Sequence, residues 1–326
     1  MLDRVRRKKR VLPFVLLALL LGVNAYLIAL LLRPEPEISA EPAAQSTQAI
    51  TPTATPSASP TDPDPSPSPR SPSPSTKSSP SPTADVIPSK RLLFAASDRE
   101  AWRATVGDCE TSGTVERSTD GGKTWRRAVN SGLAPIVRLG LDGAGNVYTI
   151  GGEGDACSTR YTEYSADGEV VASTDNPINL WFSRPKDRDQ VYGPGSNEAT
   201  PCDGSHVVGV SSLTVSEALV ICTDGSAMVT SDSGESWEEA DQLPGTMAVG
   251  SGGGRYWIAG IAAKCDGISV RSLASSKGEL TPGPSRCAPA SKVTAGRVAI
   301  DVSDKTIWVW AGQKVRTSTD GGETWT

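Results

Sequence analysis

The sequence is poor in the residue types on which most enzyme chemistry depends. Its 326 residues include one histidine, His206, and aromatic residues make up only 5%. A single histidine excludes the metalloprotease motif H-E-x-x-H and leaves a serine or cysteine hydrolase only one residue on which to build a triad. No C-x-x-C pair, phosphate-binding glycine loop or EF-hand calcium loop is present. We therefore expect no metal ion, no cofactor and no catalytic residue of these kinds.

Amphipathic helical periodicity is missing after residue 88, which points to an all-β domain. Six runs each read as strand, polar turn, strand: "RLLFAASDREAWRATVG", "PIVRLGLDGAGNVYTIGG", "INLWFSRPKDRDQVYGPG", "SLTVSEALVIC", "TMAVGSGGGRYWIAG" and "RVAIDVSDKTIWVWAG". Tryptophans in these runs are expected to pack between layers, with sugar stacking as the alternative.

One octapeptide recurs along the chain. "STDGGKTW" (Ser118–Trp125) returns as "STDGGETW" (Ser318–Trp325), with a looser copy "TSDSGESW" (Thr230–Trp237) between them. Weaker copies, "YSADGEVV" and "LASSKGEL", place the anchor positions at 120, 167, 232, 276 and 320. Their separations of 47, 65, 44 and 44 residues fit a propeller-blade period, with one oversized step.

Each copy has the residues of a tight turn between two strands. The aspartate can bond to nearby backbone N–H groups, the glycines permit positive φ, and the tryptophan can pack over the hairpin. We expect a structural role for Ser118, Asp120, Gly122, Trp125, Asp167, Asp232, Gly234, Trp237, Ser318, Asp320, Gly322 and Trp325.

The octapeptide resembles the Asp-box, or bacterial neuraminidase repeat, S/T-x-D-x-G-x-T/S-W. This resemblance implies a β-propeller of about six blades, or alternatively five, in which the box joins the third and fourth strands of a blade. Five copies serve six strand pairs, so the third blade, from Pro177 to about Val210, would lack a box. The last box ends at Trp325, and "ADVIPSK" (Ala84–Lys90) is the segment available to complete the last blade.

The resemblance does not extend to an active site. Sialidases of this family carry an F/Y-R-I-P motif, an arginine trio, a tyrosine–glutamate pair and an aspartate acid/base. "FSRP" (Phe182–Pro185) is a poor match in a middle blade, so no catalytic position carries over.

The N-terminal region predicts a membrane anchor and a tether. Residues 1–10 are strongly basic, and Val11–Leu32 is apolar except for Asn24, long enough to span a bilayer with the N-terminus in the cytoplasm. A cleaved signal peptide, with "ISA" (Ile38–Ala40) as its site, is the alternative. Residues 33–87 are expected to form a disordered Pro/Ser/Thr-rich linker, since 15 of the 25 prolines fall between Pro34 and Pro88.

The extracellular part, residues 88–326, is predicted to be acidic and disulfide-bonded. The chain after Arg33 holds 25 basic and 36 acidic residues, a charge that argues against nucleic acid as a partner. Six cysteines outside the cell predict three disulfides among fifteen possible connectivities. Pairing nearest neighbours gives Cys109–Cys157, Cys202–Cys222 and Cys265–Cys287.

Acidic residues flank the cysteines in loops expected opposite the Asp-box turns. They are Asp108, Glu110, Glu153, Asp155, Asp203 and Asp266. They form either a binding face for a cationic partner or ordinary solvent-exposed loops of a domain that is acidic throughout. We expect a monomeric, non-enzymatic binding or scaffold module at a bacterial envelope, its partner an envelope protein or a glycan. A carbohydrate-active enzyme or lectin, and an envelope-complex assembly factor, are the alternatives.

Overall fold

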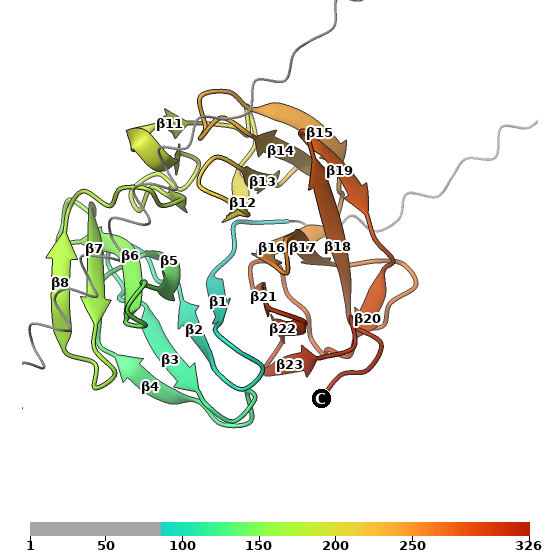
Figure 1. Cartoon of the computed structure of the whole chain (residues 1–326), viewed down its shortest axis with the longest axis horizontal. Coiled ribbons are helices and arrows are strands. Elements are labelled where there is room, and N and C mark those ends of the chain that lie inside the picture. The colour runs from blue at the N-terminus through green and yellow to red at the C-terminus, as the bar shows by residue number, and fades with distance from the viewer. Residues whose placement is uncertain (1–85) are drawn as a thin grey trace, which may run out of the picture. The chain divides into compact units, whose positions relative to one another are not determined.

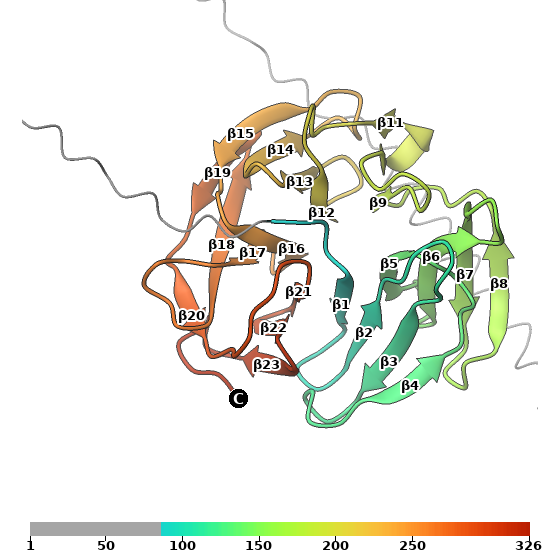
Figure 2. The same cartoon turned by 180° about the vertical axis from the view of Figure 1, so that it is seen from behind.

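The computed structural model describes residues 86–326, which form six antiparallel β-sheets arranged in a ring (Figures 1 and 2). Within this range no helix is long and apolar enough to span a bilayer. The predicted cytoplasmic tail (1–10), membrane segment (11–32) and nearly all of the predicted linker (33–87) lie outside the described residues. The described part is thus an all-β, six-bladed propeller.

Four of the six blades have four consecutive strands. Blade 1 contains β1 (Arg91–Ala95), β2 (Ala101–Thr105), β3 (Thr114–Ser118) and β4 (Arg126–Val129). Blade 2 contains β5 (Ile136–Leu141), β6 (Val147–Glu153), β7 (Ser158–Tyr164) and β8 (Val170–Thr174). Blade 4 contains β12 (Val207–Ser212), β13 (Ala218–Cys222), β14 (Ser226–Thr230) and β15 (Glu238–Gln242). Blade 5 contains β16 (Thr246–Gly252), β17 (Arg255–Gly260), β18 (Ile268–Ser276) and β19 (Glu279–Pro282), with β20 (Arg286–Ala288) also paired to β18.

The other two blades have three strands each. Blade 3 contains β9 (Phe182–Ser183), β10 (Val191–Tyr192) and β11 (Glu198–Ala199), with a short 3-10 turn at Pro194–Ser196. Blade 6 contains β21 (Val298–Ser303), β22 (Thr306–Ala311) and β23 (Lys314–Ser318). Thr326 exchanges two backbone hydrogen bonds with Thr317 of β23. A single residue therefore pairs with β23 at the position of a fourth strand.

The core lies between neighbouring blades. Every residue of β13 and of β22 is buried, because a second strand is covered by a blade on each face. Trp308 is fully buried, and Trp102, Trp181 and Trp310 are at most 6% exposed. Packing between blades, rather than an open aromatic surface, accounts for these four side chains.

Blade 3 departs from the predicted plan because its innermost strand runs the other way. Trp181, just before β9, donates from Nε1 to the carbonyl of Val215 in the β12–β13 turn. After β9, the Asp189 carboxylate accepts a hydrogen bond from the Val207 amide, where β12 begins. β9 is therefore antiparallel to β12, whereas the sequence predicted an ordinary inner hairpin here.

The predicted closure of the ring by "ADVIPSK" is wrong for its described part. Residues 86–90 do not pair with β23. Instead, the Ser89 amide donates to the carbonyl of Val208, and the Lys90 amide donates to that of Gly296. The segment therefore lies against the starts of β12 and β21, where backbone acceptors and apolar side chains are available.

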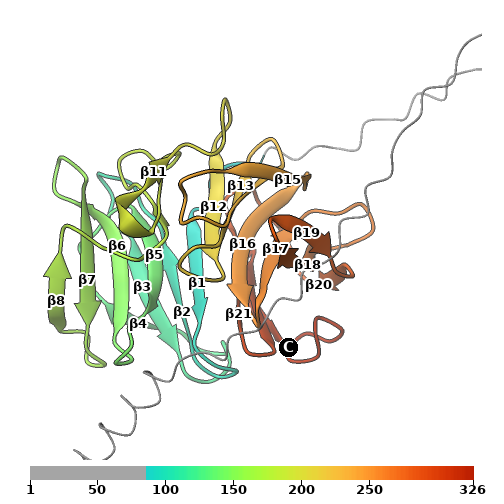
Figure 3. The same cartoon turned by 45° about the horizontal axis from the view of Figure 1, so that its top comes forward.

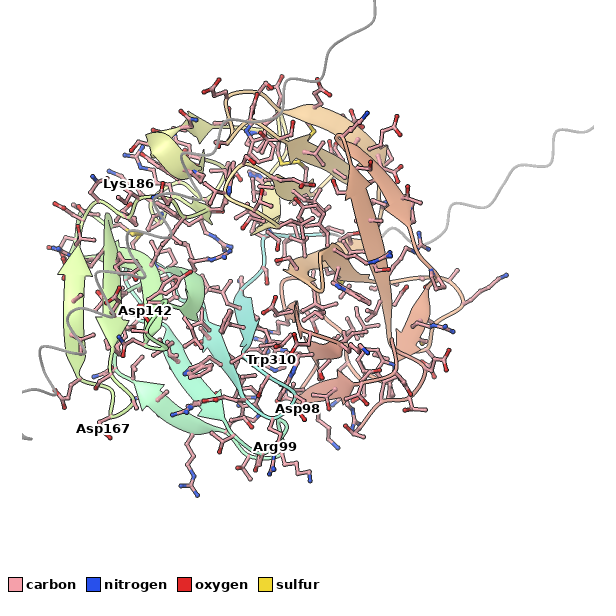
Figure 4. All side chains as sticks on the ribbon, in the orientation of Figure 1. Asp98, Arg99, Asp142, Asp167, Lys186 and Trp310 are labelled. Carbon is pink, nitrogen blue, oxygen red and sulfur yellow. A yellow bond between two sulfur atoms is a disulfide. The ribbon has the colours of Figure 1, made fainter. Side chains whose placement is uncertain are left out.

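Ring closure depends instead on side chains that join blade 6 to blade 1. Asp301 accepts a hydrogen bond from the Ala95 amide at 2.8 Å, and Trp308 Nε1 donates to the carbonyl of Ser97 at 3.0 Å. Trp310 lies at this seam (Figure 4), with the Arg91 guanidinium 4.1 Å from its ring centroid. Cation–π contacts of this kind each contribute about 0.5–2 kcal/mol.

Candidate binding face and axial channel

Three turns that follow third strands (β3, β14 and β23) share one hydrogen-bonding pattern. In blade 1, Ser118 Oγ and the Thr124 amide both donate to Asp120 Oδ1 at 2.9 Å, and Thr124 Oγ1 donates to Oδ2 at 2.6 Å. Asp232 and Asp320 repeat this arrangement in blades 4 and 6. We call these three the Asp turns. Hydrogen bonds to the ionised carboxylates, from the hydroxyl four residues on above all, hold the pKa of each aspartate below its usual value.

The Asp turns also pack one blade on the blade beside it. Gly122 has φ of +81°, and a Cβ there would lie 3.0 Å from the Trp308 ring of blade 6. Gly234 has φ of +90°, and its Cβ would lie 3.1 Å from the Trp181 ring of blade 3. Glycine is required for both conformation and close approach. In these turns the sequence repeat thus shapes the contact between blades.

The weaker copy in blade 2 has lost this network. Ser165 still accepts from the Glu169 amide, but Asp167 is exposed and its carboxylate accepts no hydrogen bond from the described residues. The structural role expected for Asp167 is therefore not visible in its contacts.

Three disulfides lie away from the Asp turns, at the other end of the strands. Cys222 is in β13 and Cys287 is in β20, and the other four cysteines are in loops. The bonds are Cys109–Cys157, Cys202–Cys222 and Cys265–Cys287, the predicted pairing. The first links blades 1 and 2, the second links blade 4 to the connection that enters it, and the third lies within blade 5. Cys202 follows β11, the third strand of blade 3. We call the loops that carry these residues the cysteine-bearing face.

The six predicted acidic residues are all exposed on or beside these loops, but they are not equivalent. Asp108 Oδ1 accepts from the amides of Glu110 and Thr111, which lowers its pKa and fixes its own turn. Glu153 forms an ion pair with Arg160 at 2.6 Å. Within residues 86–326, Glu110, Asp155, Asp203 and Asp266 form no ion pair and are available to a partner.

The charge of this face is mixed near blade 6. Asp266 lines a shallow hollow together with Lys292, Lys314 and Arg316. The acidic character is therefore concentrated at Glu110, Asp155 and Asp203, which lie in the loops of blades 1 to 3. No group of His, Cys, Asp and Glu side chains between residues 86 and 326 is arranged to hold a metal ion.

A polar cavity of about 190 Å³, which we call the channel, lies where the innermost strands of all six blades meet. Arg138 of β5, Arg188 of the β9–β10 turn and Asp301 of β21 line it together with serine hydroxyls. Arg188 donates from Nη2 to the carbonyl of Ser89, while the buried Nε atoms of Arg138 and Arg188 have no hydrogen-bond acceptor in the described chain. The lining therefore includes three arginines and a single carboxylate. The third arginine, Arg91, donates to the carbonyls of Arg297 and Gly312.

Asp301 has an unusual protonation equilibrium for an aspartate. Its desolvation within the ring raises its pKa to about 7, although the Ala95 amide and the charge of Arg138 both oppose this rise. The side chain keeps partial contact with solvent through the channel. Its charge state thus changes near neutral pH.

The channel residues were not among the sequence candidates. Arg138 and Asp301 occur inside apolar strand runs, "PIVRLGL" and "RVAIDVS". A charged side chain in the middle of an innermost strand is the available signal, because such positions face the axis. Arg188 carries no such signal, since only the reversed path of blade 3 brings it to the channel. His206 lies outside the channel and is exposed, with Nδ1 2.7 Å from Asp189 Oδ2.

Comparisons with known proteins add little beyond the architecture. Neither a protein-family model nor a curated protein matches the sequence. Among solved structures, a GH74 xyloglucanase from Xanthomonas campestris is 15% identical, with 75% of this chain aligned to 38% of that one and a TM-score of 0.31. PorZ, a surface component of the type-IX secretion system of Porphyromonas gingivalis, is 12% identical over 74% of this chain and 38% of that one, with a TM-score of 0.39.

A gluconolactonase from Xanthomonas campestris is 14% identical, covering 72% of this chain and 87% of that one, with a TM-score of 0.42. This chain spans well under half the length of the xyloglucanase and of PorZ. Likenesses this weak carry no argument about activity or partner.

Proposed function

We propose that this chain is a membrane-anchored binding module that holds its propeller outside a bacterial cell. The basic residues 1–10 and the apolar Val11–Leu32 support the anchor and its orientation. The disulfides support an oxidising compartment, where such bonds form and persist. A single membrane span with its N-terminus in the cytoplasm is consistent with both the N-terminal segments and the disulfides.

The observation that carries the binding role is the disulfide-bonded cysteine-bearing face. Each of its three disulfides has a cysteine outside regular strands, at Cys109, Cys202 and Cys265, so they restrain loops as well as the sheets. A partner that meets ordered loops loses less conformational entropy on binding than one that must order them. The Asp turns use their carboxylates internally and are nearly identical in sequence, which leaves little basis for specificity.

The partner we propose is a cationic envelope protein or a cationic glycan, bound by a monomeric propeller. Glu110, Asp155 and Asp203 supply exposed carboxylates without an ion-pair partner in the described chain. The acidic balance of the extracellular part disfavours nucleic acid. Binding would therefore weaken as salt is added, because exposed charges are screened.

The test is in vivo photo-crosslinking of the full-length protein at the membrane, followed by affinity measurement with the captured partner. Charge reversal of Glu110, Asp155 and Asp203 to lysine should abolish the crosslink and remove the salt dependence. Matched reversals of the exposed Lys123 and Glu235 in the Asp turns should leave both unchanged. If the Asp-turn variants lost binding and the reversals at Glu110, Asp155 and Asp203 did not, the partner would bind at the opposite end of the propeller and the proposal would be wrong.

A carbohydrate-active enzyme is the second candidate, and the axial cavity favours it. Asp301, with a pKa near 7 in a confined polar site, has the protonation behaviour of a general acid. Glycoside hydrolysis by the usual route needs a second carboxylate, and Asp301 is the only one among the cavity-lining residues. A panel of chromogenic glycosides tests this candidate: turnover by the full-length protein that Asp301→Asn abolishes would favour it over the binding role.

A further inference from the structure

The outer strand of blade 2 differs from the other outer strands of the four-stranded blades. Exposed edge strands invite pairing with other chains, and folded proteins usually block them with charged residues or proline. β4 carries Arg126 and Arg127, β15 has the sequence "EEADQ", and β19 contains Glu279 and Pro282. β8 has the sequence "VVAST", without a charge or a proline.

β8 is also the most apolar exposed part of the described surface. Val170 is 60% exposed and Val171 is 53% exposed, so valines on both faces of the strand contact solvent. Ile178, a few residues further on, is 61% exposed. These are three of the five large apolar side chains that are exposed within residues 86–326, and they fall in one nine-residue stretch.

The backbone of β8 is free on its outer side. Between residues 86 and 326 it pairs only with β7, through Tyr161–Thr174, Thr162–Ser173, Glu163–Ala172 and Tyr164–Val170. Figures 1 and 2 place β8 at the rim of the ring, and Figure 3 shows it as the outermost strand of its blade. Blade 3 ends at its third strand, so no fourth strand from the neighbouring blade lies beside β8.

We propose that β8 is a docking edge that accepts an extended strand from a partner protein as a fifth strand of blade 2. Backbone hydrogen bonds along the free edge would supply affinity, and β-branched side chains next to Val170 and Val171 would cover them. This site is separate from the cysteine-bearing face and does not depend on the function proposed for it.

The charges around β8 define the chemistry of that strand. Glu169 and Asp167 lie at one end of β8, exposed and without an ion pair in the described chain. Asp175, at the other end, is also exposed but lines a hollow with Arg184 and Lys186. Asp167 projects outward from the β7–β8 turn (Figure 4). A second copy of β8 would bring like charges together, because antiparallel self-pairing sets Glu169 near Asp175 of the other molecule. The occupant is therefore an apolar, β-branched segment with lysine or arginine at the end that lies beside Asp167 and Glu169.

The test uses full-length protein in detergent micelles and the synthetic peptide KKVTVTVKK as the probe. Hydrogen–deuterium exchange should show protection of the amides of residues 170–174 on peptide binding. Val170→Lys and Val171→Lys should each weaken binding at least tenfold by restoring edge protection. Val215→Lys is the matched control: Val215 is 57% exposed but lies in the β12–β13 turn, so binding should not change.

Two further peptides test the individual parts of the inference. A peptide with proline at its central position should not bind, because proline lacks the amide needed for the ladder. EEVTVTVEE should bind at least tenfold more weakly than the lysine form. Equal binding of either peptide, or equal protection of β4, β15 and β19, would overturn the proposal. Concentration-dependent dimers that Val170→Lys abolishes would overturn the assignment of a basic partner.

Discussion

Replacing Asp301 with asparagine should change how the stability of the propeller depends on pH. Because desolvation raises the pKa of Asp301 from 3.8 to about 7, the folded protein holds a proton there that the unfolded chain releases. The stabilisation from this proton is fully present below about pH 4 and is lost as the pH rises through about 7. Asparagine mimics the protonated acid at every pH and keeps an oxygen to accept from the Ala95 amide.

The expected magnitude follows from the size of the pKa change. An acid whose pKa rises from 3.8 to about 7 on folding loses roughly 4 kcal/mol of native stability when it is fully ionised. Asp301 keeps partial exposure in the channel, and such solvent contact weakens the effect. We expect about half of that value, roughly 2 kcal/mol, to be measurable between pH 4.5 and 8.

The assay is urea denaturation of the full-length protein, followed by tryptophan fluorescence. All eight tryptophans lie after residue 100, so the signal reports the propeller. Asp301→Asn should lie closest to wild type near pH 4.5 and be about 2 kcal/mol more stable at pH 8. Asp304→Asn, an exposed change in the β21–β22 turn, is the control and should follow wild type throughout. A constant difference between Asp301→Asn and wild type across this pH range would refute the reasoning.

Three further changes test how the ring is held together. Asp120→Ala should lower Tm at neutral pH, and the loss should shrink below about pH 4, because hydrogen bonding lowers the pKa of this carboxylate and its stabilisation vanishes as it is protonated. Replacing Cys109 and Cys157 with serine should cost about 2–4 kcal/mol by uncoupling blades 1 and 2, while intact mass without reductant should show three bonds in wild type and two in the variant. Trp308→Phe keeps a buried aromatic ring but deletes the indole N–H that bonds to blade 1 and leaves part of the site unfilled, so urea denaturation should show a loss of about 1 kcal/mol or more.

The sequence was sufficient to predict the architecture because each Asp turn is specified by a short local motif and the spacing of these motifs gives the length of a blade. Asp120, Asp232 and Asp320 form hydrogen bonds only to residues within four positions, so each turn is encoded by its own octapeptide. The spacing of these turns gives the blade period. The disulfide pairing followed for the same reason, since each bond joins cysteines that are neighbours along the chain.

Features that depend on closing the ring were not predictable in this way. The contact between Asp301 and the Ala95 amide spans 206 positions, and neither residue lies in a motif. The same holds for the contact between Arg188 and Ser89, which spans 99. The wrong prediction for "ADVIPSK" has the same origin. The carbonyls of Val208 and Gly296, which accept from Ser89 and Lys90, come close to this segment only when the six blades have closed into a ring.

The blade that breaks the repeat creates the features that distinguish this propeller from a symmetric ring. The 65-residue step in the Asp-box spacing corresponds to blade 3, whose inner strand is reversed. Reversal carries the β9–β10 turn to the channel, where Arg188 adds a positive charge that a regular blade would not place there. Because blade 3 has no fourth strand, no outer strand of that blade lies beside β8, whose valines are exposed. A regular blade 3 inserted by design should therefore alter both the channel charge and the edge at β8, while the Asp turns of blades 1, 4 and 6 keep their hydrogen bonds.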